Sequence, residues 1–87
     1  MSFSPYDLSV TSGSQVVFDF QERNHTVVFD TPTNATKPPN INGGRGDRDP
    51  IPVGEKRTIT VSGNPGGKTP YYCGIHGPSM PGVINIV

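Results

Sequence analysis

The run Gln15-Val16-Val17-Phe18-Asp19-Phe20 carries apolar side chains at every second position. Val16, Phe18 and Phe20 would lie on one side of an extended chain, because successive side chains of a strand point to opposite faces. The segment from Lys56 to Ser62 has the same pattern, with Ile59 and Val61 alternating with threonines. Both runs predict β-strands with one buried face.

Other parts of the chain also predict strands separated by turns. The expected strands are Phe3 to Val10, His25 to Phe29, a strand that ends at Tyr71-Tyr72-Cys73, and Val83 to Val87. Pro5 places the first of them near a sheet edge. The clusters Thr11 to Ser14 and Gly63 to Gly67 are typical of turns. Six or seven short strands without a convincing helix predict an all-β domain, a small antiparallel sandwich or barrel.

Residues 31–52 have a different character. This stretch contains five Pro and three Gly and shows no hydrophobic periodicity. We expect one long irregular loop near residues 31–52, either a surface loop or a loosely attached excursion. Loops of this length in small domains are usually functional or mobile.

Composition limits the architecture and the partners. Residues 1–87 are enough for a single domain with one small core. Seven basic and seven acidic residues cancel, so no net charge favours nucleic acid or an anionic membrane. No apolar run approaches the roughly 20 residues of a membrane span. There is also no signal-peptide pattern, and we expect a mature form or an excised domain.

Apart from Met1, the side chains that bind softer metal ions (thiol, imidazole and thioether) occur at only two places in the sequence. His25 lies in Asn24-His25-Thr26, and the others form the run Cys73-Gly74-Ile75-His76-Gly77-Pro78-Ser79-Met80. Taken singly, Cys73 would most often be a small buried residue, Met80 a filler of the core and His25 an ordinary histidine. The single Cys cannot form an intramolecular disulfide. Their joint placement instead indicates a metal site formed by His25, Cys73, His76 and Met80.

The types of donor select the metal. Structural zinc sites normally use four Cys, His or carboxylate ligands, and a thioether is a poor zinc donor. Two imidazoles, a thiolate and a weak thioether form the donor set of mononuclear blue-copper sites, which accept both Cu(I) and Cu(II). His25 lies 48 residues before Cys73, so this site requires two distant strands to meet. We expect one copper ion per chain.

These residues resemble the cupredoxins, the family of small blue copper proteins that includes plastocyanin, pseudoazurin and amicyanin. The most specific part is Tyr72-Cys73-x-x-His76-x-x-x-Met80-x-Gly82. Weaker similarities are Val10 to Val16, Asn24-His25, Val53-Gly54-Glu55 and Gly82-Val83-Ile84, so the resemblance covers nearly the whole chain. It implies a Greek-key β-sandwich of about seven to eight strands. The three residues between His76 and Met80 exceed the amicyanin-like spacing and are one fewer than in plastocyanins.

The resemblance also implies a function. A cupredoxin-like chain is a one-electron carrier, not an enzyme, and works in the periplasm, the thylakoid lumen or outside the cell. We expect a monomer whose redox partners dock transiently at the His76 end, where the neighbouring Gly, Ile and Pro residues carry no charge. Thr26 stands where the family often has Asn, and its hydroxyl is expected to tie the two ligand segments together. Tyr72 resembles the tyrosine that offers plastocyanins a second electron route.

Other functions remain open on the sequence alone. The same ligands would suit a protein that stores or delivers copper. An enzyme with Cys73 as nucleophile and His25 or His76 as base would need a substrate pocket. Arg45-Gly46-Asp47 spells the integrin-recognition tripeptide and would suit an adhesive module. Asn24 and Asn34 fit the pattern of N-glycosylation sites.

Overall fold

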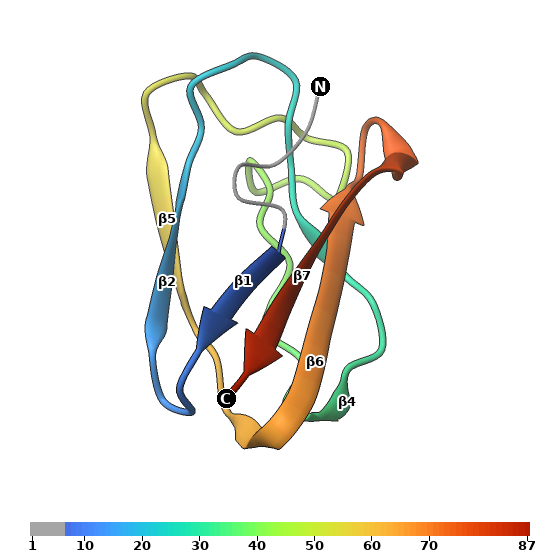
Figure 1. Ribbon diagram of the computed structural model, residues 1–87. Helices are drawn as coiled ribbons and strands as arrows, with labels where there is room; N and C mark the ends of the chain where they lie inside the picture. Colours follow the sequence, from blue (N-terminus) through green and yellow to red (C-terminus); the bar gives the residue numbers. More distant parts are fainter. Residues whose placement is uncertain (1–6) are drawn as a thin grey trace.

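The computed structural model describes residues 7–87, which form β-strands and turns without a helix (Figure 1). The part of the first predicted strand before Asp7 lies outside the described residues. The strands, in chain order, are β1 (Asp7–Val10), β2 (Gln15–Asp19), β3 (Val28–Phe29), β4 (Thr33–Ala35), β5 (Lys56–Thr60), β6 (Gly63–Cys73) and β7 (Gly77–Ile86). The all-β class predicted from the sequence is therefore confirmed.

The strands form two sheets. The larger has the order β1-β7-β6-β3, with β4 also paired to β6, and the smaller contains only β2 and β5. Figure 1 shows β2 and β5 side by side to the left of β1, β7 and β6. Side chains from both sheets meet in one core, in which the ring of Phe18 packs edge-on against Tyr71 and Phe29 at centroid distances of 5.4 and 6.3 Å. Burial raises the pKa of Tyr71 to about 12.

The larger sheet is mixed rather than purely antiparallel. Strand β1 pairs with β7 in parallel, from Asp7 opposite Val83 to Val10 opposite Ile86. All other strand pairs are antiparallel. The prediction of an antiparallel sandwich or barrel is wrong for this pair. A parallel partner far away in the sequence leaves no local pattern, because nearby turns reveal only hairpins.

Strand β6 begins earlier than the sequence predicts. Gly63 to Gly67 belong to this strand and not to a turn. A Cβ atom on Gly63 or Gly67 would lie 2.5 or 2.6 Å from the backbone oxygen of Asn34. Glycine is therefore required here for the close approach of β4. In the sequence alone, glycines with this role in a strand look the same as glycines in a turn.

The segment 31–52 is anchored to the core, so its description as loosely attached is wrong. It contains β4, and the side chains of Ile41 and Ile51 are buried. Ile41 exchanges two backbone hydrogen bonds of 2.8 Å with Val27, and the N–H of Ile51 donates to the carbonyl of His25 at 3.0 Å. These bonds attach the long segment beside His25.

Candidate metal centre

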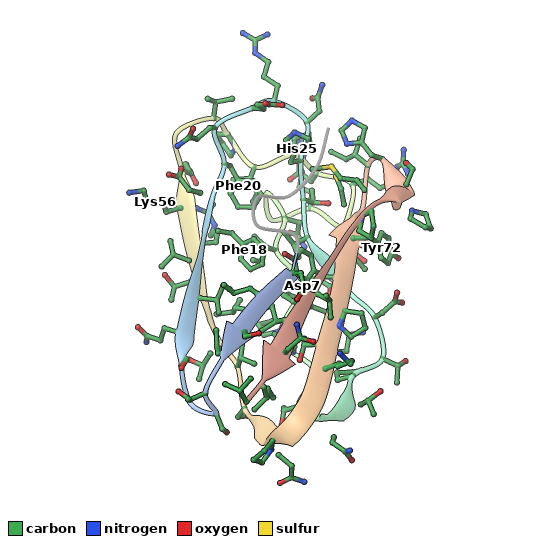
Figure 2. All side chains as sticks on the ribbon, in the orientation of Figure 1. Asp7, Phe18, Phe20, His25, Lys56 and Tyr72 are labelled. Atoms are coloured by element: carbon green, nitrogen blue, oxygen red, sulfur yellow. The ribbon has the colours of Figure 1, made fainter. Side chains whose placement is uncertain are left out.

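His25, Cys73 and His76 come together at one end of the molecule. His25 precedes β3, Cys73 is the last residue of β6, and His76 lies in the turn between β6 and β7. Antiparallel pairing of β3 with β6 places Val28 opposite Tyr72 and so brings the two segments together. Figure 2 shows His25 at the same end as the β6–β7 turn.

The three side chains have the spacing of ligands around a single ion. Cys73 Sγ lies 3.8 Å from His25 Nδ1 and 3.3 Å from His76 Nδ1. The three possible ligand atoms all lie within 4.8 Å of one another. Metal–sulfur bonds of ~2.3 Å and metal–nitrogen bonds of ~2.0 Å would separate a sulfur and a nitrogen ligand by roughly 3.5–3.7 Å at tetrahedral to trigonal angles. The residues present therefore fit a bound metal ion.

The site is buried on one side and open on the other. The exposed fraction is 0% for Cys73 and 6% for His25, whereas His76 is only partly buried. A thiol that is fully enclosed is protected from solution reagents. His76 is thus the one of the three that also reaches the surface.

Thr26 ties the two ligand segments together, as the sequence predicts. Its hydroxyl oxygen accepts a hydrogen bond of 3.0 Å from the N–H of Gly74. Thr26 is fully buried, so this bond is shielded from water. The residue after His25 and the residue after Cys73 are thereby joined directly.

Glu22 faces the other nitrogen of His25. Its carboxylate lies 3.8 Å from Nε2, while Nδ1 faces Cys73. A histidine that binds a metal usually turns its second ring nitrogen toward a carboxylate, a carbonyl or water, which fixes the orientation of the ring. Glu22 is not predicted from the sequence, although its position three residues before a candidate ligand is a usable signal.

Met80 lies on β7, and its exposed fraction is 5%. The next residue, Pro81, pairs with Tyr72, which immediately precedes Cys73. The hairpin of β6 and β7 thus carries Met80 on the strand that pairs with the Cys73 strand. A ligand role for the Met80 thioether stays a prediction, as does an electron route through Tyr72.

Arg48 also reaches the candidate centre. Its guanidinium donates a hydrogen bond of 3.2 Å to the carbonyl of Gly74. The prediction that no charge surrounds the His76 end is therefore wrong at this point. No sequence pattern could reveal this contact, because Arg48 and Gly74 lie 26 residues apart.

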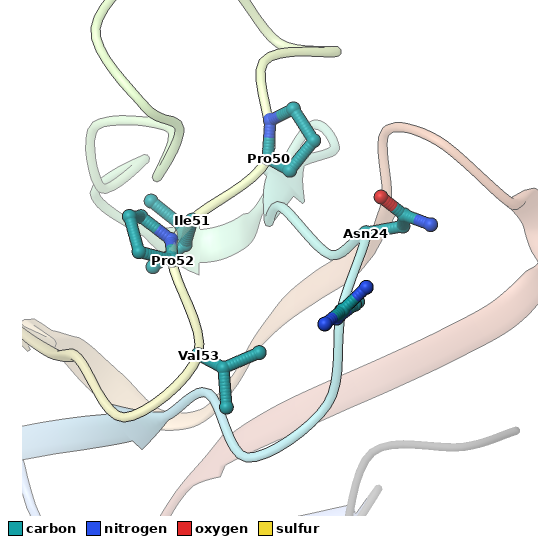
Figure 3. Close-up of a pocket in the computed structure, with 6 residues that line it drawn as sticks. Asn24, Pro50, Ile51, Pro52 and Val53 are labelled. Carbon is teal, nitrogen blue, oxygen red and sulfur yellow. The ribbon is translucent and has the colours of Figure 1, made fainter.

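Figure 3 shows a groove to which Asn24, the residue before His25, contributes. It is lined by Arg23, Asn24 and the run from Pro50 to Val53. Cys73 and His76 are not among its lining residues.

Searches against models of protein families and among curated proteins found no match for this chain. None of the residues 7–87 belongs to a helix that could cross a membrane. The case for a function therefore depends on the geometry of the centre.

Proposed function

We propose that this protein is a mononuclear blue-copper protein that carries single electrons between redox partners. The observation that supports it most strongly is the fully buried Cys73 thiol between the Nδ1 atoms of His25 and His76. When bound, copper would supply the change between Cu(I) and Cu(II).

The donor set favours copper over a structural zinc ion. Among residues 7–87, the group of close ligand atoms includes one thiol and two imidazoles but no fourth Cys, His or carboxylate. Closed zinc sites normally use four such ligands. Thiolate suits Cu(I) and imidazole suits both oxidation states, with Met80 as the expected weak fourth ligand.

The protein's part is to hold these ligands in place during electron transfer. The backbone of His25 is fixed by Ile51, and that of Gly74 by Thr26 and Arg48. Ligands that keep one arrangement need little movement when the charge on the metal changes. His76 links the buried centre to the surface, so an electron partner would approach there.

An optical titration of the metal-free protein with Cu(II) tests the proposal. We expect an intense visible band from thiolate-to-Cu(II) charge transfer and a reversible one-electron wave in voltammetry. The Cys73→Ser variant should lose the band, because a hydroxyl cannot supply this transition. A band that persists in Cys73→Ser would exclude Cys73 as the ligand.

The same titration separates this function from copper storage or delivery. A storage protein would bind Cu(I) without colour and release it readily to a competing chelator. That result in the wild-type protein would replace electron transfer by copper handling as the function of the site.

A further inference from the structure

Residues 42–49 form a loop, the clasp loop, that is folded on itself. The N–H of Gly43 donates to the carbonyl of Asp49 at 2.7 Å, and the N–H of Asp49 donates to the carbonyl of Gly46 at 2.9 Å. The guanidinium of Arg45 lies 3.3 Å from the Asp49 carboxylate. A hydrogen bond from Arg45 is the main cause that lowers the pKa of Asp49. These contacts give the loop a defined shape of its own.

One side of the clasp loop rests on Gly74, the residue that follows Cys73. The Thr26 hydroxyl accepts from the N–H of Gly74 and donates to the carbonyl of Asp47 at 2.6 Å. Arg48 donates to the carbonyl of Gly74 at 3.2 Å. Both backbone polar groups of Gly74 are therefore satisfied by Thr26 and the clasp loop.

The contact is close enough to require glycine at position 74. A Cβ atom there would lie 2.3 Å from the carbonyl oxygen of Asp47 and 2.7 Å from the Thr26 hydroxyl. Contacts below 3.0 Å are essentially never seen for real Cβ atoms. The clasp loop and the turn from Cys73 to His76 are thus packed backbone against backbone.

We propose that the clasp loop positions the Cys73–His76 turn, with Thr26 and Arg48 as positioning residues, and that the charge of Arg48 raises the reduction potential of the bound metal. The part about the potential rests on the proposed function. The positioning of the turn by the clasp loop applies to the metal-free protein as well.

The direction of the effect on the potential follows from charge. The Arg48 guanidinium is held at the carbonyl of the residue bonded to Cys73. Reduction adds one negative charge to the centre, and a nearby cation favours that state. Asp47 carries the opposing charge in the same loop, but it contacts Thr26 through its backbone carbonyl, whereas its carboxylate accepts a hydrogen bond of 3.1 Å from Asn40. Among residues 7–87, no carboxylate forms an ion pair with Arg48.

The same contacts assign a structural role to Arg45-Gly46-Asp47. The Arg45 guanidinium is engaged by Asp49, and Asp47 is engaged through both its carboxylate and its carbonyl. These contacts fix the shape of the loop, while the Arg45 side chain stays largely exposed to solvent.

Two measurements test the proposal. The first is amide hydrogen exchange at Gly74 in the metal-free protein. Thr26→Val keeps the shape of the side chain and removes its hydrogen bonds, so exchange at Gly74 should accelerate by roughly fivefold or more. Arg48→Gln should accelerate it in the same direction.

The second measurement is the midpoint potential of the copper-loaded protein. Arg48→Gln should lower the potential, and Arg48→Lys should restore most of it because the charge returns. Lys37→Gln is the matched control, since it removes one exposed charge from the same long segment. Lys37→Gln should leave both the potential and Gly74 exchange unchanged.

The two readouts separate failure of the clasp from failure of the function. Unchanged Gly74 exchange in both Thr26→Val and Arg48→Gln would overturn the positioning role. A blue wild-type protein whose potential does not respond to Arg48→Gln, or responds equally to Lys37→Gln, would overturn the role of the charge. A colourless wild-type protein would remove the proposed function, while accelerated exchange in the variants would still support the clasp.

Discussion

The two ring nitrogens of His25 face different partners, and this division determines what the residue can do. Nδ1 lies 3.8 Å from the Cys73 sulfur, and Nε2 lies 3.8 Å from the Glu22 carboxylate. A metal bound at Nδ1 would leave the proton on Nε2, where the carboxylate favours it. Glu22 is largely exposed, so water weakens its effect. Glu22 is thus expected to orient His25 without being essential for binding.

We expect Glu22→Gln to lower the affinity for copper by up to about tenfold, the low end of the range for residues that orient a ligand. Competition with a chelator of known affinity measures this change. Asp30→Asn is the control, because it removes an exposed carboxylate with no assigned partner among residues 7–87. Equal loss of affinity in both variants would show that only net charge matters.

At the level of strands, the sequence predicted individual strands better than their pairing partners. The alternation in Gln15 to Phe20 and in Lys56 to Ser62 correctly indicated β2 and β5. Cys73 at the end of a strand was also correct. These signals are local, because each depends on the period of side chains along one strand.

The contacts between distant segments could not be predicted in the same way. Strand β4 consists of only three residues inside a Pro-rich segment, and it pairs with β6 across a shift of register. The contact from Arg48 to Gly74 depends on how the whole segment 31–52 is anchored. Such contacts are fixed by packing, and the residue types at the two ends do not identify the contact partner.

Gly67 shows how a strand contact depends on a missing side chain. We expect Gly67→Ala to reduce the free energy of unfolding by about 1–3 kcal/mol, as overpacking usually does. The new Cβ atom would meet the backbone oxygen of Asn34 at 2.6 Å, so β4 must move away from β6. Urea denaturation measures the loss, and amide exchange at Lys68 should report it locally.

Asn64→Ala is the matched control for this change. Asn64 is an exposed residue of the same strand, and its replacement adds no atom near β4. Stability close to that of the wild type is expected for the control. Equal effects of the two substitutions would mean that β4 does not pack against β6 as closely as described.

For the molecule as a whole, the candidate centre joins parts of the chain that are otherwise far apart. His25 comes from the segment before β3, and the other two candidate ligands come from the β6–β7 hairpin. A chain of 87 residues has a small core. An ion held by all three ligands would therefore add an appreciable share of its stability. The unfolded chain keeps only Cys73 and His76 close together, so it should bind the ion more weakly.

Metal binding should consequently raise the melting temperature. Zn²⁺ is a suitable probe, because it is redox-inert and accepts thiolate and imidazole ligands. A free concentration about 100-fold above the dissociation constant should add roughly 2.7 kcal/mol to the free energy of unfolding. For a domain of this size the melting temperature should rise by roughly 10–20 °C. Cys73→Ser, which nearly preserves the shape of the side chain, should show a much smaller rise. An equal rise in both proteins would mean that the ion binds elsewhere and that Cys73 takes no part in a shared site.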